Sequence, residues 1–151
     1  MSPDCAACEI VRGARVPLGG VLLRSGGFVL HAVDGPTPVP GWLVLTAERC
    51  TRAVYTLGED ELAALMPLAA RVMRLQRERL GAEHVYLFAI GDVLTHCHVH
   101  LVPRYADTPA HLRGRGVFDA KPPEHLAPGA VAAACRTLQA GLGLTAPSDP
   151  R

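Results

Sequence analysis

The stretch from Thr95 to Arg104 reads T-H-C-H-V-H-L-V-P-R and places three of the seven histidines, His96, His98 and His100, at alternate positions of an apolar run. Successive side chains of an extended strand point to opposite faces, so residues two apart share a face at a spacing of roughly 6.6 Å. The stretch therefore predicts a strand with a row of three imidazoles on one face.

Such a row has three interpretations. As core histidines, the rings would bury several polar nitrogens that each need a partner. As ligands of one zinc ion, three alternate residues of a flat strand would be nearly collinear and would converge poorly on a tetrahedral ion. In covalent catalysis, one neutral imidazole nitrogen attacks phosphorus while a hydrogen bond to its other nitrogen fixes the tautomer.

The chain around the row predicts an α+β domain on a mainly antiparallel sheet. Apolar runs bounded by turn residues predict strands at 21–24, 28–33, 42–47 and 85–90, with a turn at 91–92 before the histidine row. A proline-rich loop separates the second and third runs.

Helical periodicity predicts one long and one short helix. Thr56 and Glu59 have the spacing of a capping box at the start of the long helix, which should end near Gly81. Pro67 lies inside it and predicts a kink or break near residues 62–63. The short helix is expected around 129–140, and about 145–151 should be a frayed tail.

Composition narrows the class of protein. The length of 151 residues suits one domain, 1–151. The net charge of +1 gives no basic field for a nucleic-acid polymer. No apolar run is long enough for a membrane span, and the amino terminus has no signal-peptide pattern, so we expect a cytoplasmic protein.

The run H-C-H-V-H-L-V, His96 to Val102, resembles the His-φ-His-φ-His-φ-φ motif (φ apolar) of the histidine triad (HIT) nucleotide hydrolases and transferases. The segment F-V-L-H-A-V-D-G-P-T-P-V-P-G-W-L-V-L, 28–45, is similar to the strand, proline loop and following strand of that family. With C-A-A-C-E-I-V-R-G at the front, the resemblance spans Cys5 to about Tyr105 and suggests the zinc-carrying, diadenosine polyphosphate hydrolase-like branch.

The resemblance implies an enzyme with a HIT-like fold, acting on a small nucleotide and assembled as a homodimer. His98 would attack the α-phosphorus of a dinucleoside polyphosphate or nucleoside phosphoramidate, giving a nucleotidyl-histidine intermediate, and His100 would contact the phosphate or leaving group. Asp34 would bind the ribose hydroxyls, although an aspartate before Gly35 also suits a turn. Apolar side chains near Phe28 and Val33 would flank the base.

The cysteine pair Cys5 and Cys8 is compatible with free thiols or with a metal site. In zinc-carrying relatives the pair is completed by a histidine after the third strand and by the first histidine of the triad. Here Cys50 occupies that third position, so the resemblance implies one structural zinc per chain bound by Cys5, Cys8, Cys50 and His96. Cys97 and Cys135 are expected to be apolar fillers.

The segment before the triad departs from the family pattern. It reads F-A-I-G-D-V-L-T, with Asp92 and Val93 where many members have phosphate-binding Gln and Ser or Thr. A carboxylate beside a polyphosphate is repulsive unless a cation intervenes, so Mg²⁺ could accompany the substrate. The candidates for replacing the lost donors, each also compatible with a solvated surface role, are Thr95, Arg104, Arg113 and Arg115. The alternative to an enzyme is a catalytically weak, zinc-stabilised nucleotide-binding interaction protein.

Overall fold

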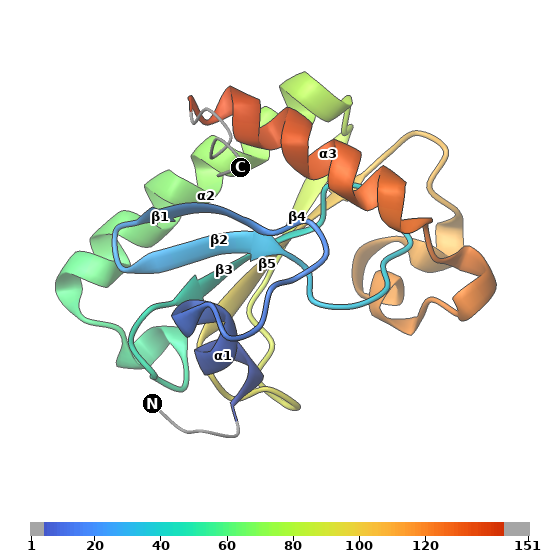
Figure 1. Cartoon of the computed structure of the whole chain (residues 1–151). Helices are drawn as coiled ribbons and strands as arrows, with labels where there is room; N and C mark the ends of the chain where they lie inside the picture. The colour runs from blue at the N-terminus through green and yellow to red at the C-terminus, as the bar shows by residue number, and fades with distance from the viewer. Residues whose placement is uncertain (1–4, 144–151) are drawn as a thin grey trace, which may run out of the picture.

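Five antiparallel strands form the sheet that carries the histidines, in the order β1-β2-β3-β5-β4 (Figure 1). The computed structural model describes residues 5–143. The strands are β1 (Val21–Ser25), β2 (Phe28–Ala32), β3 (Leu43–Ala47), β4 (His84–Phe88) and β5 (His98–Arg104). Ser25 pairs with Phe28, so β1 and β2 are joined by Gly26 and Gly27, whose φ angles of 59° and 80° suit a tight hairpin turn.

Three α-helices and four short 3₁₀ segments surround the sheet. The helices are α1 (Ala6–Arg12), α2 (Glu59–Leu80) and α3 (Pro128–Gly141). The 3₁₀ segments are η1 (Val54–Thr56), η2 (Ala110–Leu112), η3 (Gly114–Asp119) and η4 (Pro122–Glu124). Among residues 5–143, no helix combines the length and hydropathy that a membrane span needs.

The two faces of the sheet have different partners. Helices α2 and α3 contact each other and lie against one face, where Leu30, Leu45 and Leu101 are fully buried (Figure 1). The alternate residues of the same strands, including His98 and His100, point to the other face. That face is covered by the segment after β5, through a second apolar cluster that contains Trp42 and Val117. The histidines therefore lie between the sheet and this later segment.

These observations confirm the predicted α+β architecture, the long helix and the carboxy-terminal helix. The capping box was placed wrongly: Gly58 is the N-cap of α2 and its N–H donates to Glu61 Oε2 at 2.7 Å, while Thr56 lies in η1. The predicted helix break is also wrong, because α2 is continuous across Pro67 and packs buried residues on both sides of it. The predicted tail, 145–151, lies outside the described residues.

Candidate functional site

Two of the three motif histidines form the predicted row. His98 and His100 both lie on β5, opposite Thr46 and Val44 of β3, with ring centroids 4.9 Å apart and planes at 84°. His96 lies before β5 begins, in the connection 89–97. The prediction of three imidazoles on one strand face is therefore wrong at its first member, because the chain turns before the strand starts.

His98 is held in one orientation by the backbone. Its Nδ1–H donates to the carbonyl oxygen of His96 at 2.7 Å. In a neutral imidazole only one nitrogen carries a proton, so this bond leaves Nε2 with a free electron pair. The ring also lines a cavity of about 820 Å³ on the sheet face away from the helices. His98 therefore has the protonation pattern of a nucleophile.

His100 has the opposite pattern. The indole Nε1–H of Trp42 donates to His100 Nδ1 at 3.1 Å, so the imidazole proton lies on Nε2. The edge-to-face rings of Trp42 and Phe118 lie 5.6 Å and 5.3 Å from the imidazole, centroid to centroid. Burial, followed by the charges of His98 and His31, lowers the pKa of His100 to about 4. His100 is thus a neutral hydrogen-bond donor.

The cavity in front of the two rings has mainly apolar walls and a few charged groups. The loop before β3 and the connection 89–97 supply one part of its lining, and the η3 to η4 segment supplies the other. The lining residues are Val33, Pro36, Pro38, Trp42, Ile90, Asp92, Val93, Leu94, His98, His100, Arg115, Val117, Phe118, Asp119, Ala120 and His125. This combination of apolar walls and a few convergent polar groups is typical of a small-molecule site.

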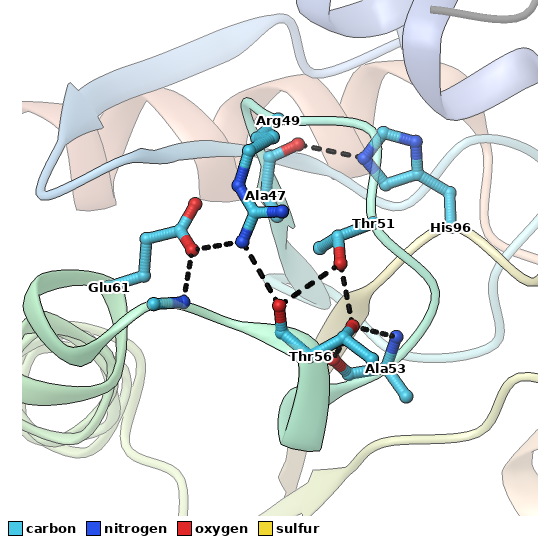
Figure 2. A network of polar contacts seen from close by, with 8 residues as sticks. Ala47, Arg49, Thr51, Ala53, Thr56, Glu61 and His96 are labelled. Carbon is cyan, nitrogen blue, oxygen red and sulfur yellow. Dashed lines mark hydrogen bonds and ion pairs between the residues drawn. The ribbon is translucent and has the colours of Figure 1, made fainter.

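His96 belongs to a second cluster, with Cys5 and Cys8. Its Nδ1 lies 3.5 Å from Cys5 Sγ and 3.4 Å from Cys8 Sγ, and the three ligand atoms all lie within 4.8 Å of one another. His96 Nε2 donates to the carbonyl oxygen of Ala47 at 2.8 Å (Figure 2). This leaves the Nδ1 electron pair for the two thiols. A backbone partner of this kind fixes the tautomer of metal-binding histidines.

These residues fit zinc. Ligand atoms bound to one tetrahedral zinc at 2.0 to 2.3 Å lie roughly 3.5 Å apart, which matches the two sulfur to nitrogen distances. Cys8 is fully buried and Cys5 is half-buried at the N-cap of α1. Cys5, Cys8 and His96 would therefore hold the ion, which would tie α1 to the start of β5.

Cys50 is less closely placed. Its side chain is exposed, and it is not among the three residues whose ligand atoms lie within 4.8 Å. Cys50 is nevertheless close enough to Cys8 to affect its pKa. Burial raises the pKa of Cys8 to about 11, together with hydrogen bonds to the Cys50 and Cys5 thiols. Cys50 as the fourth ligand stays a prediction.

The loop that carries Cys50 is held by a polar network. Arg49 donates to Glu61 Oε2 at 2.7 Å and to the carbonyl of Thr56 at 3.0 Å, and the Thr51 and Thr56 hydroxyls lie 2.6 Å apart (Figure 2). On the other side, Cys97 N–H donates to the carbonyl of Thr51 at 2.6 Å. The loop is thus bound both to α2 and to the segment between His96 and His98.

The predicted substrate-binding residues do not gather at the cavity. Asp34 Oδ2 forms an ion pair with Arg15 Nε at 2.6 Å, and the neighbouring Val33, rather than Asp34, lines the cavity. Phe28 is fully buried in the core on the helix side, so it cannot flank a base here; alternation along β2 directs it away from the histidine face. Thr95 is exposed and does not line the cavity.

Of the three candidate arginines, only Arg115 lines the cavity, where it pairs with Asp119 at 3.4 Å. Arg104 pairs with Glu83 and Arg113 donates to the carbonyl of Thr108. Asp92 and Val93 both line the cavity.

Sequence reasoning missed the aromatic residues around His100. Trp42 is only the first residue of the predicted strand 42–47, and Phe118 lies between the histidine row and the predicted helix 129–140, where the sequence predicts no helix or strand. Phe118 contacts Trp42 and Phe88 as well as His100, at centroid distances of 5.0 Å and 5.4 Å for the first two. A tryptophan beside the proline loop was a usable signal for Trp42; no sequence pattern signalled Phe118.

Solved structures of similar fold cover nearly the whole chain. A zinc-bound histidine triad family protein from Mycobacterium smegmatis has a TM-score of 0.70 and 19% identity, over 93% of this chain and 94% of that one. A hypothetical histidine triad nucleotide-binding protein from Sulfolobus tokodaii has a TM-score of 0.72 and 17% identity, over 92% of each chain. A histidine triad protein from Bradyrhizobium japonicum has a TM-score of 0.67 and 21% identity, over 80% and 88%.

Neither a protein-family model nor a curated protein matches the sequence. Sequence identities of 17 to 21% establish similarity of fold and not of function. The chain has the α+β fold of the histidine triad proteins.

Proposed function

We propose that this chain is a nucleotide hydrolase or nucleotidyl transferase that forms a covalent intermediate on His98. The observation that carries the proposal is the hydrogen bond from His98 Nδ1 to the carbonyl of His96, because it leaves an unprotonated Nε2 at the edge of the cavity. A neutral imidazole in a fixed tautomer is an effective nucleophile toward phosphorus.

In the first step, the Nε2 electron pair of His98 forms a bond to the α-phosphorus, and the bond from phosphorus to the leaving group breaks. His100 Nε2–H donates a hydrogen bond to a phosphoryl oxygen, where negative charge develops. In the second step, the oxygen of water or another acceptor bonds to the same phosphorus, the P–N bond breaks with its electron pair returning to His98 Nε2, and the proton of the attacking hydroxyl passes to solvent. The cavity walls around Trp42 and Phe118 suit a flat nucleoside.

Two of the solved structures of similar fold support parts of this proposal. The Sulfolobus tokodaii protein is described as nucleotide-binding, and the Mycobacterium smegmatis protein is zinc-bound. We assign zinc a structural role here, held by Cys5, Cys8 and His96 with Cys50 as the proposed fourth ligand. A Mg²⁺ ion between Asp92 and the substrate, the ribose contact of Asp34, the homodimer and the cytoplasmic location stay predictions.

The test measures AMP release from diadenosine tetraphosphate, diadenosine triphosphate and AMP-lysine. Acid quenching during turnover of α-³²P-labelled substrate should trap label on the protein. His98→Ala should release no AMP and trap no label. His84→Ala is the matched control, since His84 is exposed on the edge strand β4 and lies outside the cavity lining.

The alternative is a nucleotide-binding protein without turnover. Asp92 and Val93 in the cavity lining favour it, because neither offers a neutral donor to phosphate. Binding of AMP with no release from any of the three substrates, and no difference between His98→Ala and the unmodified protein, would select the alternative.

A further inference from the structure

His100 is enclosed by groups from four neighbouring elements, and none of them offers an acceptor or a negative charge to its Nδ1. Trp42, at the start of β3, donates to that nitrogen, and Phe118 of η3 packs edge-on against the ring. On β5 the neighbour is His98, and across the sheet His31 of β2 adds a further repulsive charge when protonated. Phe88 of β4 lies opposite His100 in the strand register.

The charged groups of the cavity do not change this enclosure. Arg115 and Asp119 pair with each other at 3.4 Å, and both side chains are mostly exposed, at 76% and 67%. Asp92 is exposed in the connection 89–97, and His125 Nε2 lies 3.3 Å from the carbonyl of Ala120. No described carboxylate is hydrogen-bonded to His100.

The position of the indole is fixed from behind. Trp42 is only 5% exposed, and the carbonyl of the preceding residue, Gly41, accepts a hydrogen bond from Gln76 Nε2 at 2.9 Å. Gln76 also donates to the carbonyl of Leu101 at 3.0 Å, so one buried side chain of α2 joins the start of β3 to the strand of His100. Gly41 has a φ of 76°, and a Cβ there would clash with the side chain of Leu80.

An indole nitrogen is a donor only. A doubly protonated His100 would place two N–H groups face to face at 3.1 Å, so the second proton requires that this bond break. Because the indole is buried and its backbone is tied down, breaking the bond would disturb packing on several elements. The bond from Trp42 therefore favours the neutral form of His100 with hydrogen on Nε2.

We propose that Trp42, as a positioning residue, makes the site selective for nucleoside phosphoanhydrides over nucleoside phosphoramidates by keeping His100 a neutral donor. This inference rests on the proposed function. When His98 displaces a phosphate from the α-phosphorus, the P–O electron pair goes to the leaving oxygen, which is stable as an anion because its pKa is about 6. No proton is needed.

A phosphoramidate has a different requirement. When the P–N bond breaks, the electron pair goes to the amine nitrogen, whose conjugate acid has a pKa of about 10.4 for lysine, so the nitrogen must receive a proton to leave. An imidazolium at position 100 would supply that proton, and a neutral imidazole does not. Position 100 thus offers no general acid to an amine leaving group.

The first test compares kcat/KM for diadenosine tetraphosphate and AMP-lysine, measured as AMP release by the full chain. We expect the anhydride to be preferred by about 100-fold or more, which is the lower range of a general-acid contribution. AMP-lysine cleavage within about tenfold of the anhydride would overturn the inference and leave the proposed function intact. If neither substrate releases AMP, the proposed function itself fails.

Variants at position 42 separate the protonation effect from packing. Trp42→His and Trp42→Gln offer an acceptor to Nδ1–H of a protonated His100. Both should therefore reduce the preference for diadenosine tetraphosphate over AMP-lysine by about tenfold or more. Trp42→Phe removes the indole N–H without adding an acceptor, so it should narrow the preference less than the other two variants do. Equal losses on both substrates in all three variants would show a purely structural role.

Nitrogen NMR on the unmodified protein keeps the inference testable if these variants fail to fold. From pH 8 to pH 5, the ring nitrogens of His100 should keep the chemical shifts of a neutral imidazole that is protonated at Nε2 and unprotonated at Nδ1. A His100 signal that becomes doubly protonated near the ordinary pKa of 6.5 would overturn the inference.

Discussion

At the scale of single residues, two hydrogen bonds of opposite direction give His98 and His100 different chemistry. The carbonyl of His96 accepts from Nδ1 of His98, whereas the indole of Trp42 donates to Nδ1 of His100. Two identical side chains on one strand face therefore direct an electron pair and an N–H into the same cavity. In the proposed mechanism, the hydrogen-bond partners of the rings decide which histidine attacks and which one stabilises charge.

The lowered pKa of His100 predicts how stability depends on pH. The unfolded chain takes up this proton near pH 6.5 and the folded chain only near pH 4, so the unfolded state binds more protons between these values. The contribution is fully present above pH 6.5 and is lost as the pH falls toward 4. Its upper limit is about 3 kcal/mol, reduced by any water that reaches the ring.

Urea unfolding at several values between pH 7 and pH 4 measures this effect. His100→Gln, which does not titrate, should show a shallower fall in the free energy of unfolding than the unmodified protein. Parallel curves for the two proteins would contradict the prediction. The comparison between them also cancels the pH dependence that the cysteine cluster contributes to both.

At the scale of elements, α2 stays helical across Pro67 because the packing of the helix against the sheet outweighs the cost of an interior proline. Pro67 is exposed in the helix interior, where proline costs about 3 kcal/mol relative to alanine. Pro67→Ala should therefore stabilise the protein by about 2 kcal/mol and raise Tm by roughly 5 °C in a thermal melt. Met66→Ala, the neighbouring exposed position, is the control and should change Tm little; equal shifts in both variants would contradict the argument.

The buried Gln76 of α2 joins this helix to two strands. Its Nε2 donates to the carbonyls of Gly41 and Leu101, and the side chain is fully buried. Gln76→Met would remove both hydrogen bonds, at about 0.5 to 1.5 kcal/mol each, so we expect a loss of about 1 to 3 kcal/mol in urea unfolding. Glu78→Met, on the exposed side of the same helix, should have almost no effect. A stable Gln76→Met variant would show that water replaces the amide.

Patterns within a single element were predictable from the sequence, and contacts between elements were not. Alternation and helical periodicity located the strands, α2 and α3, because these signals depend only on which face is buried. The position of Asp34, the orientation of Phe28 and the turn before His98 depend on where each strand begins, and the sequence does not define that to one residue. Phe118 reaches His100 from η3, through a contact that no local pattern records.

At the scale of the whole molecule, His96 joins the cysteine cluster to the cavity residue His98. The side chain of His96 faces the thiols of Cys5 and Cys8. The backbone carbonyl oxygen of His96 accepts a hydrogen bond from His98 Nδ1–H. The cluster also ties α1 to the sheet through the bond from His96 Nε2 to Ala47. A structural ion in this place would therefore support the orientation of His98, the proposed nucleophile, through a ligand two residues away along the chain.

Metal removal is the test of this connection. The purified protein should contain about one zinc per chain, and Cys5→Ser combined with Cys8→Ser should lose it, because serine does not supply the thiolate that zinc prefers. Apparent binding free energies of structural zinc are about 10 kcal/mol or more, so Tm should fall by more than about 10 °C. AMP release should fall by roughly 10 to 100-fold even at temperatures where the variant stays folded, since the backbone partner of His98 is no longer fixed. Cys135→Ala removes a thiol outside the cluster and should keep the zinc. An unmodified protein without zinc, or a double variant with unchanged AMP release below its Tm, would contradict the link between the two sites.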